Sequence, residues 1–422
     1  MIRHLYSLAW WLALPLVLGR LWWRGRKEPG YRQQMAERFG FYAQRPAGNM
    51  IWVHAVSVGE TRAAEPLIDA LLQAYPGHAI LLTHMTPTGR ATGRALFGKH
   101  GERLVQCYLP YDTGWMVSRF LRHFMPRICI LMETEVWPNL IAQCNAHRVP
   151  VALVNARLSE RSLKKAQKLS ALMTDAARGF SVVAAQTDAD AQRLRDFGAP
   201  NVQVTGSIKF DVTPPEQALA TGRALRGLMG ARPVLLCAST REGEEALILD
   251  ALAAAGLEDC LLVIVPRHPQ RFDEVAAMVE ARGLKLQRRS ALAAPLPPDV
   301  RVLLGDSMGE MFAYYAACDL AFIGGSLLPL GGQNLIEACA VGKPVLVGPH
   351  TFNFSVVTEG AIAAGAALRV QDAGEMLREA SRLLHAEHAR THMGGNASAF
   401  AQQHRGATVR TMALLIPLIP RG

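Results

Sequence analysis

This chain is organised around the stretch Met50-Ile-Trp-Val-His-Ala-Val-Ser-Val-Gly-Glu-Thr-Arg62. Residues 50–53 form a short apolar run of the kind that makes a buried parallel strand. The chain then turns, and the apolar spacing from Ala63 to Leu72 predicts a helix. Glu60 is therefore expected just after the carboxyl end of the strand, where open α/β sheets bind ligands. The alternative is that Ser57 and Glu60 only cap the helix, since S-x-x-E is a common capping pair.

The same order of apolar run, polar turn and helix repeats along the chain. In the first half the further runs are 80–83, 105–109, 128–132, 151–154 and 182–185. The rhythm breaks at 206–215, where two adjacent prolines halt regular structure. It then restarts with runs at 234–238, 261–265, 302–304, 320–323 and 344–347. Strands that alternate with helices predict an α/β protein with parallel sheets covered on both faces.

We therefore expect two doubly wound domains, residues 31–205 and 216–422, joined by a hinge at 206–215. The last helix of the second domain is free to pack back on the first. A length of 422 residues fits this division, because it exceeds what one ordinary core accommodates. The cleft between two such domains is the default place for an active site.

The net charge and the cysteines indicate the kind of binding partner and the redox state of the compartment. The formal net charge is +10, which favours an anionic partner such as a membrane surface, a phosphorylated lipid, a nucleotide or a nucleic acid. The seven cysteines are scattered, with no C-x-x-C pair and no zinc spacing. Dispersed thiols in apolar runs are typical of a reduced, cytoplasmic protein.

Residues 1–30 read as a membrane anchor with a basic flank. Residues 5–19 are apolar, and five cations follow them, namely Arg20, Arg24, Arg26, Lys27 and Arg32. Because the run is shorter than the roughly twenty residues of a full span, it either crosses marginally or lies in the interface. A buried helix packed on the first domain is the third reading. The positive-inside rule keeps the bulk of the protein in the cytoplasm.

Polar residues follow the predicted strands of the second half, at Ser239, Arg267, His268, 308–310 and 324–325. The stretch Gly331-Gly-Gln-Asn-Leu-Ile-Glu337 then places two glycines before a predicted helix, whose free N–H groups suit a phosphate. Glu337 could accept hydrogen bonds from ribose hydroxyls. We therefore interpret the second half as nucleotide-binding and the first as the acceptor side.

Several familiar motifs are missing from the sequence. It holds no G-x-G-x-x-G after a strand, no P-loop, no H-E-x-x-H and no G-x-S-x-G, which argues against dehydrogenases, P-loop NTPases, zincins and α/β-hydrolases. Asp188-Ala-Asp190 has the form of a metal-binding pair, but its place at a helix start favours capping. A cationic cluster, Arg161, Lys164, Lys165 and Lys168, reads as a solvated helix face that could also touch an anionic acceptor.

Motifs along nearly the whole chain together resemble the bacterial Kdo transferases, which attach the acidic sugar Kdo (3-deoxy-D-manno-oct-2-ulosonic acid) to lipid A precursor. The matching motifs are 21–27, 54–60, 85–89, 109–112, 132–139, 155–159, 206–211, 265–269, 324–326 and 348–354. The resemblance implies the two-domain glycosyltransferase fold called GT-B, with a membrane-bound N-terminal region. It also implies CMP-Kdo as donor, lipid A precursor as acceptor, the cytoplasmic face of the inner membrane as location, and no nucleic-acid partner.

The resemblance assigns roles motif by motif. Glu60 would be the general base, and Glu133 and Lys209 would support the transition state. The contacts to CMP would come from Arg267, His268, Met308, Gly309, Glu310, Asn334, Leu335, Ile336 and Glu337. Gln333 stands where the family usually has histidine; it can donate a hydrogen bond but cannot become cationic.

The expected chemistry is a direct displacement with inversion. CMP is a good leaving group, so one base suffices. The sequence shows no metal-binding cluster or cofactor motif, and we expect metal-independent transfer. A helix N-terminus is expected to lower the pKa of Glu60 and keep it ionised. The rival functions are a two-domain sugar-nucleotide epimerase and a membrane-tethered nucleotide-binding protein without catalysis.

Overall fold

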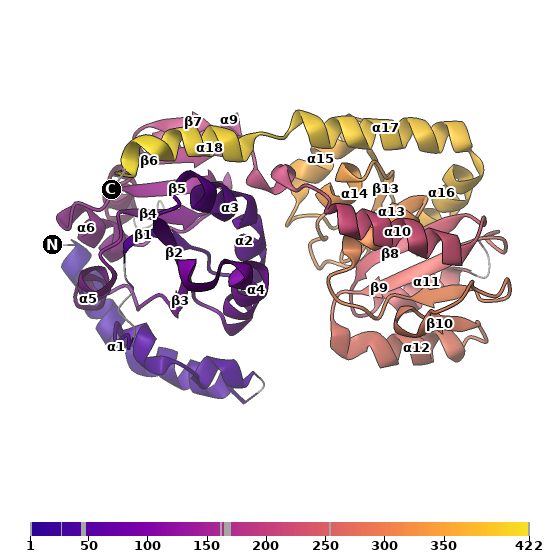
Figure 1. The fold of residues 1–422 in the computed structure, drawn as a ribbon, viewed down its shortest axis with the longest axis horizontal. Coiled ribbons are helices and arrows are strands. Elements are labelled where there is room, and N and C mark those ends of the chain that lie inside the picture. Colours follow the sequence, from indigo (N-terminus) through magenta and orange to yellow (C-terminus); the bar gives the residue numbers. More distant parts are fainter. Residues whose placement is uncertain are drawn as a thin grey trace. The chain divides into compact units, whose positions relative to one another are not determined.

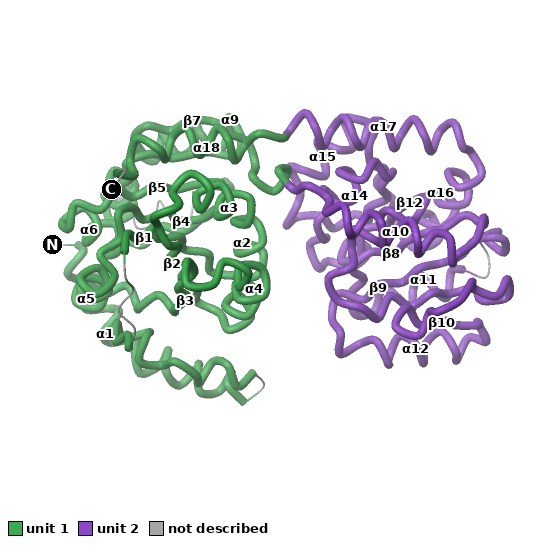
Figure 2. The backbone as a smooth tube through the Cα atoms, in the orientation of Figure 1, with its two compact units in different colours: residues 1–211, 405–422 green, residues 212–404 purple. Residues whose placement is uncertain are grey.

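A computed structural model of the chain describes residues 2–26, 28–43, 48–160, 163, 170–252 and 255–420. The cationic cluster Arg161, Lys164, Lys165 and Lys168, and Lys27 of the basic flank, lie outside the described residues. The described chain divides into two compact units (Figure 2). Unit 1 holds residues 1–211 and 405–422, and unit 2 holds residues 212–404.

Unit 1 is built on a seven-stranded parallel sheet in the order β3-β2-β1-β4-β5-β6-β7. Its strands are β1 (Asn49–His54), β2 (His78–His84), β3 (Leu104–Tyr108), β4 (Ile128–Met132), β5 (Val151–Ala156), β6 (Val182–Ala185) and β7 (Val202–Val204). The helices are α1 (Ile2–Arg24), α2 (Val58–Ala63), α3 (Glu65–Ala74), α4 (Pro87–Phe97), α5 (Gly114–Phe124), α6 (Pro138–Ala146), α8 (Ser170–Arg178), α9 (Asp188–Asp196) and α18 (Ala407–Leu415). Figure 1 shows these helices around the sheet.

Unit 2 repeats the design with a second seven-stranded parallel sheet, in the order β10-β11-β9-β8-β12-β13-β14. Its strands are β8 (Val234–Thr240), β9 (Leu261–Pro266), β10 (Leu286–Arg288), β11 (Val302–Leu304), β12 (Leu320–Ile323), β13 (Val345–Val347) and β14 (Ala367–Arg369). Its helices are α10 (Glu216–Met229), α11 (Glu244–Leu252), α12 (Phe272–Glu280), α13 (Met311–Ala317), α14 (Ile336–Ala340), α15 (Ser355–Ala363), α16 (Ala373–His385) and α17 (Glu387–Gln403).

The strand β1 shows why the sheet of unit 1 is buried on both faces. Trp52 packs into one core cluster, and its neighbours Ile51 and Val53 pack into another, because successive side chains of a strand point to opposite faces. A strand buried on both sides reads as a continuous apolar run rather than an alternating one. The prediction of two doubly wound α/β units is confirmed.

The sequence analysis missed three strands, β7, β10 and β14. All three lie at sheet edges and are three residues long, and their sequences are Val-Gln-Val, Leu-Gln-Arg and Ala-Leu-Arg. A strand covered on fewer sides needs no continuous apolar run, so the pattern that revealed the central strands is absent here.

The chain passes from unit 1 to unit 2 between residues 211 and 212, inside the segment expected to be a hinge, and returns at residue 405. The returning helix α18 packs its Met412 and Leu415 into the core of unit 1. Asp211 holds the start of this helix, because its carboxylate accepts the N–H of Gly406 at 2.6 Å and that of Thr408. A carboxylate at a helix N-terminus satisfies orphan donors and the helix dipole.

Replacing Asp211 with alanine should destabilise unit 1 by about 1–2 kcal/mol, the usual cost of losing a cap. All seven tryptophans lie in unit 1, so tryptophan fluorescence during urea unfolding reports on this unit alone. Asp250→Ala, which removes a surface pair with Arg282, is the matched control and should not move the transition. An unchanged urea midpoint for Asp211→Ala would show that α18 is held by other contacts.

Candidate active site

The carboxyl ends of β1 and β4 form the switch point of unit 1, where the strand order reverses. From β1 the chain adds β2 and then β3 on one side of it. It then crosses to the other side of β1, where β4 to β7 follow in order. A crevice therefore opens there in doubly wound sheets, and ligands bind in it. Glu60, in α2 after β1, and Glu133, directly after β4, both lie at this point.

Glu60 is held by the turn that leads into α2. Its Oε2 accepts the N–H of Val56 and its Oε1 accepts the hydroxyl of Ser57, both at 2.9 Å. The Ser57 side chain in turn accepts the N–H of Glu60. The capping pair considered from the sequence is therefore present. It orients the carboxylate at the switch point, so capping and a chemical role are compatible.

The pKa of Glu60 is raised, mainly by burial and further by the charge of Glu133. The hydrogen bonds from Val56 and Ser57 and the charge of Lys209 act in the opposite direction. The sequence-based expectation of a lowered pKa was therefore wrong. The helix start does supply its donors, but they compensate only part of the loss of water around the carboxylate.

The structure brings Glu133 together with Lys209, the two residues to which the resemblance gave a role in supporting the transition state. Lys209 Nζ lies 2.6 Å from Glu133 Oε1, and Arg157 Nε lies 3.4 Å from Oε2. Asn155, at the end of β5, accepts the N–H of Ile208 with its side-chain oxygen at 3.1 Å, which fixes the turn that carries Lys209. Glu133 itself has a φ of 58°, a left-handed conformation that non-glycine residues seldom adopt.

Glu135 is a third carboxylate of this cluster, and the sequence analysis did not single it out. Burial, with added repulsion from Glu60 and Glu133, raises its pKa to about 7. Trp137 Nε1 donates a hydrogen bond to Oε2 at 2.6 Å, which limits the rise. His54 Nε2 lies 4.0 Å away, and burial lowers the pKa of His54 to about 3, so this imidazole is neutral at pH 7.

Glu135, Asn155 and Arg157 could have been found from the sequence. Each stands within three residues of the end of a predicted strand, in the motifs 132–139 and 155–159. Polar side chains at that edge of a parallel sheet converge whatever their separation along the chain. Choosing among several such residues requires the strand order, which a single sequence does not supply.

The switch point of unit 2 lies between β8 and β12 and is organised by a buried carboxylate. Glu244 has no exposed surface. It accepts the backbone N–H groups of Arg241, Gly325, Ser326 and Leu327 at 2.6–2.9 Å. These bonds join the turn after β8 to the turn after β12. The sequence analysis noted both turns but not the glutamate that connects them.

Two backbone features show how tightly these turns approach one another. A Cβ on Gly324 would lie 2.6–2.8 Å from backbone atoms of Ser239 and Thr240, so only glycine fits there. Ser239 has a φ of 58°, the same left-handed conformation as Glu133 in unit 1. Left-handed non-glycine residues persist where surrounding contacts hold them, and they gather at functional sites.

The residues predicted to bind the nucleotide after β9 and after β11 lie at the carboxyl ends of these neighbouring strands. Arg267 and His268 follow β9, the 308–310 turn follows the adjacent β11, and β8 lies on the other side of β9. Burial and the charges of Arg241, Arg267 and Arg271 lower the pKa of His268. The edge therefore has a positive potential suited to phosphate. Glu310 pairs with Arg289 at 3.0 Å rather than lying open.

The segment 334–337 differs from its prediction. The expected helix begins only at Ile336 and is five residues long. The Asn334 side chain accepts the N–H of Ile336 at 3.1 Å and donates to Glu337 Oε1 at 3.3 Å. Leu335 and Ile336 are at most 1% exposed, so their side chains belong to the core. The side chains of Asn334 and Glu337, by contrast, are partly exposed.

Two family models match the chain. The one described as 3-Deoxy-D-manno-octulosonic-acid transferase (kdotransferase) matches residues 33–212, and Glycosyl transferases group 1 matches residues 247–400. A 3-deoxy-D-manno-octulosonic acid transferase of Bordetella pertussis is 49% identical over 98% of both chains. The chain belongs to the Kdo transferase family. A Kdo transferase of Haemophilus influenzae is 37% identical over the full length of both chains.

The resemblance inferred from the motifs is confirmed, and the chain is an enzyme of the glycosyltransferase class. Among solved structures, the UDP-GlcNAc 2-epimerase of Neisseria meningitidis bound to UDP-GlcNAc aligns with a TM-score of 0.59 and 14% identity. The alignment covers 87% of this chain and all of that chain. At this identity the likeness shows the fold alone, and the predicted GT-B-like architecture of this Kdo transferase is confirmed.

The described residues hold two further groups that have the form of metal ligands. Thr187 is the N-cap of α9, since its hydroxyl accepts the N–H of Asp190 and donates to the Asp190 carboxylate. Asp190 also accepts the N–H of Leu158 and pairs with Arg193, so its carboxylate has structural partners at the helix start. Asp259, Cys260 and His385 place three ligand atoms within 4.8 Å of one another. They stand where β9 begins, at the opposite end of that strand from Arg267.

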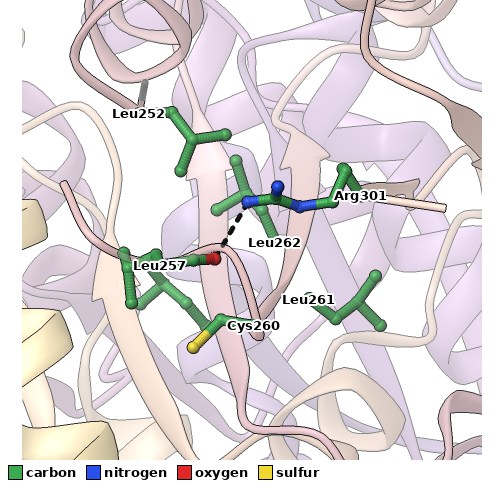
Figure 3. A pocket seen from close by; sticks show the side chains of 7 residues that line it. Leu252, Leu257, Cys260, Leu261, Leu262 and Arg301 are labelled. Carbon is green, nitrogen blue, oxygen red and sulfur yellow. Dashed lines mark hydrogen bonds between the residues drawn. The ribbon is translucent and has the colours of Figure 1, made fainter. Parts of the chain in front are cut away.

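Three hollows lined by described residues of the Kdo transferase lie outside these sites. One in unit 2, among Leu252, Leu257, Leu262 and Arg301, has a volume of about 10 Å³, room for one water (Figure 3). Another in unit 1, with a volume of 490 Å³ and Arg122, Arg127 and Arg148 in its wall, lies where β4 and β5 begin. The third lies beside α1 and is described below. Neither of the first two coincides with a switch point.

The raised pKa of Glu135 predicts a stability that falls as pH rises. The folded-state pKa of about 7 exceeds the ordinary value of 4.5, so the folded chain binds the proton more tightly than the unfolded chain. Stability is therefore lost between about pH 4.5 and 7. Glu135→Gln keeps an acceptor for Trp137 but does not titrate, so its stability does not fall over this pH range. The free energy of unfolding of the variant, relative to that of wild type, should therefore rise by about 1–3 kcal/mol from pH 5 to pH 8.

Urea unfolding followed by tryptophan fluorescence at each pH measures this difference. Glu102→Gln, at an exposed position of unit 1, is the control and should show no such trend. A constant difference between Glu135→Gln and wild type across the pH range would mean that Glu135 is ionised throughout.

Proposed function

We propose that this enzyme transfers Kdo from CMP-Kdo to lipid A precursor by a direct, inverting displacement in which Glu60 is the general base. Unit 1 activates the acceptor hydroxyl and unit 2 holds the nucleotide. The reaction takes place at the cytoplasmic face of the inner membrane, without a metal ion or another cofactor. Family membership supports the transfer of Kdo, and the geometry of each unit supports the division of roles.

The observation that carries the proposal is the environment of Glu60. Its carboxylate lies at the switch point, is oriented by Val56 and Ser57, and has a raised pKa. A carboxylate with a raised pKa accepts a proton more readily than one in water. Because the main cause is burial, the basicity is gained through the loss of water around the carboxylate.

Glu133 and Lys209 support the displacement by limiting the net negative charge of the carboxylate cluster. Kdo carries a carboxylate, so three ionised glutamates would repel the donor sugar. Lys209 and Arg157 offset two negative charges, and Glu135 is partly protonated near pH 7 because its pKa is about 7. The cluster is therefore close to neutral while Glu60 stays available as base. Lys209 can also stabilise negative charge that develops in the transition state.

The nucleotide side uses the positive edge of unit 2. Arg267 and His268, with the nearby charge of Arg241, suit the phosphate of CMP. Met308 and Gly309 are exposed, and the turn at Gly309, with a φ of 81°, offers backbone groups to the base or ribose. Asn334 and Glu337 offer an amide and a carboxylate to the ribose. The Gln333 side chain lies next to Gly325, where its amide can donate a hydrogen bond to CMP-Kdo without adding a positive charge.

The two rival functions differ in what releases CMP. An epimerase shares the fold but needs no lipid acceptor, and a non-catalytic binding protein releases no CMP at all. CMP release from CMP-Kdo should therefore depend on added lipid A precursor. Release at the same rate without the precursor would favour epimerase-like chemistry, and no release would favour simple binding.

In the same assay Glu60→Gln should lower the rate by about 10²–10⁴, the usual contribution of a general base. Binding of CMP, measured by calorimetry, should be unchanged, because the nucleotide contacts lie in unit 2. The matched control is Glu65→Gln, whose carboxyl also has a raised pKa through burial but responds to Lys99 and Asp69 rather than to Glu133. A Glu60→Gln rate within a few-fold of wild type would refute the assignment of the base.

Transfer should also persist in excess EDTA. The cationic groups around Glu133 and at the edge of unit 2 supply the charge that a metal would otherwise bring. His385→Ala, which breaks the Asp259, Cys260 and His385 group, should leave the rate unchanged as well. Loss of transfer in EDTA that Mg²⁺ restores would contradict the proposal.

A further inference from the structure

The helix α1 is docked on unit 1 along one face. Its half-buried or buried residues recur at helical spacing, at Tyr6, Ser7, Trp10, Leu14, Val17 and Leu21. Leu14 packs with Tyr111 and Met116 in a small apolar cluster, and the rings of Trp10 and Tyr111 lie 5.8 Å apart. The contact therefore runs along most of the helix rather than joining it at one end.

The docked face includes polar contacts near its first turns. Ser7 Oγ and the Asn139 side-chain amide lie 3.0 Å apart, and the Tyr6 hydroxyl bonds to Asp112. Asp112 is 1% exposed and also accepts the N–H groups of Asn139 and Leu140. Burial raises the pKa of Asp112 to about 6, so it is mostly ionised at pH 7.

The opposite face of α1 is apolar and exposed. Leu5, Leu8, Trp11, Leu12 and Leu16 are 48–78% exposed. Arginines follow at the carboxyl end of the helix, where Arg24 lies over the ring of Tyr31 at 4.3 Å and Arg32 over that of Trp22 at 4.1 Å. Leucines on one face, with tryptophans and arginines at the end, are typical of a helix in the interface of an anionic membrane.

By length and composition alone, α1 could also cross a membrane. A helix of 23 residues is about 34 Å long, close to the thickness of the hydrocarbon core. Crossing would require α1 to leave the face of unit 1, or to draw Asp112 and Asn139 into hydrocarbon. The first exposes the Tyr111 and Met116 cluster, and the second buries an ionised carboxylate in lipid.

We propose that α1 lies along the surface of an anionic bilayer, with its exposed leucine face in the acyl boundary, and does not cross the membrane. An apolar hollow of 350 Å³ between Leu18, Trp22 and Met35 opens beside the helix and can accept an acyl chain.

The contacts of α1 fall on the segments that follow β4, β3 and β2. Asn139 follows β4, Asp112 follows β3, and Pro87 after β2 meets Gly30 just beyond the helix. Leu14 of α1 packs on Met116 of α5, and Figure 1 shows the two helices near one another in unit 1. The helix therefore runs along the edge of the sheet at which Glu60 lies, and a bilayer on its outer face lies beside the route of a lipid acceptor.

The position of the first residues of α1 tests this directly in the full-length enzyme. The seven native cysteines are buried, so a single added cysteine is labelled selectively. In intact spheroplasts a membrane-impermeant maleimide should leave both His4→Cys and Met125→Cys unlabelled, and should label both after lysis. Met125 is 74% exposed and reports the side on which unit 1 lies. Labelling of His4→Cys alone in intact spheroplasts would overturn the proposal.

Depth in the bilayer gives a second test that does not depend on the transfer reaction. Spin labels at Leu5, Leu12 and Leu16, in vesicles of phosphatidylethanolamine and phosphatidylglycerol, should share one shallow depth of about 5–10 Å. A label at Leu12 near the midplane would mean that α1 crosses. Labels that sense no lipid would mean that another protein covers this face. Either result overturns the proposal, and unchanged tryptophan fluorescence of each variant shows that unit 1 is folded.

Discussion

The ion pair between Lys209 and Glu133 is the contact on which the candidate active site depends. It joins the end of β4 to the turn after β7, where the chain is about to leave unit 1, and places a cation near Glu60 as well. The charge of Lys209 also lowers the pKa of Glu60 and so acts against the rise that burial causes there. The left-handed backbone of Glu133 is consistent with a position held by these contacts.

Each unit uses its switch point differently. In unit 1 Glu60 and Glu135 lie at the carboxyl end of the sheet, are partly exposed and have raised pKa values, as proton transfer requires. In unit 2 the corresponding carboxylate, Glu244, is fully buried and satisfied by backbone N–H groups, so it shapes two turns and leaves the edge to arginines. The same sheet architecture thus supports a basic group in one unit and an anion site in the other.

The central strands and the place of Glu60 could be predicted from the sequence, whereas the ion pair between Glu133 and Lys209 could not. The strands follow from runs buried on both faces, and the resemblance to a family named Glu133 and Lys209 without indicating that they pair. The raised pKa of Glu60 could not be predicted, because burial depends on packing from several elements. Leu335 and Ile336 matched a binding motif, yet their side chains face the core, since a motif does not distinguish backbone from side-chain contacts. The short edge strands lacked any continuous apolar run.

The most direct test of the account is the structure of the enzyme with CMP and a lipid A precursor bound. The account predicts that the acceptor hydroxyl lies about 3 Å from a Glu60 carboxylate oxygen, with the Glu133 and Lys209 pair intact. A hydroxyl held by Glu133 or Glu135, with Glu60 still turned to Val56 and Ser57, would contradict it.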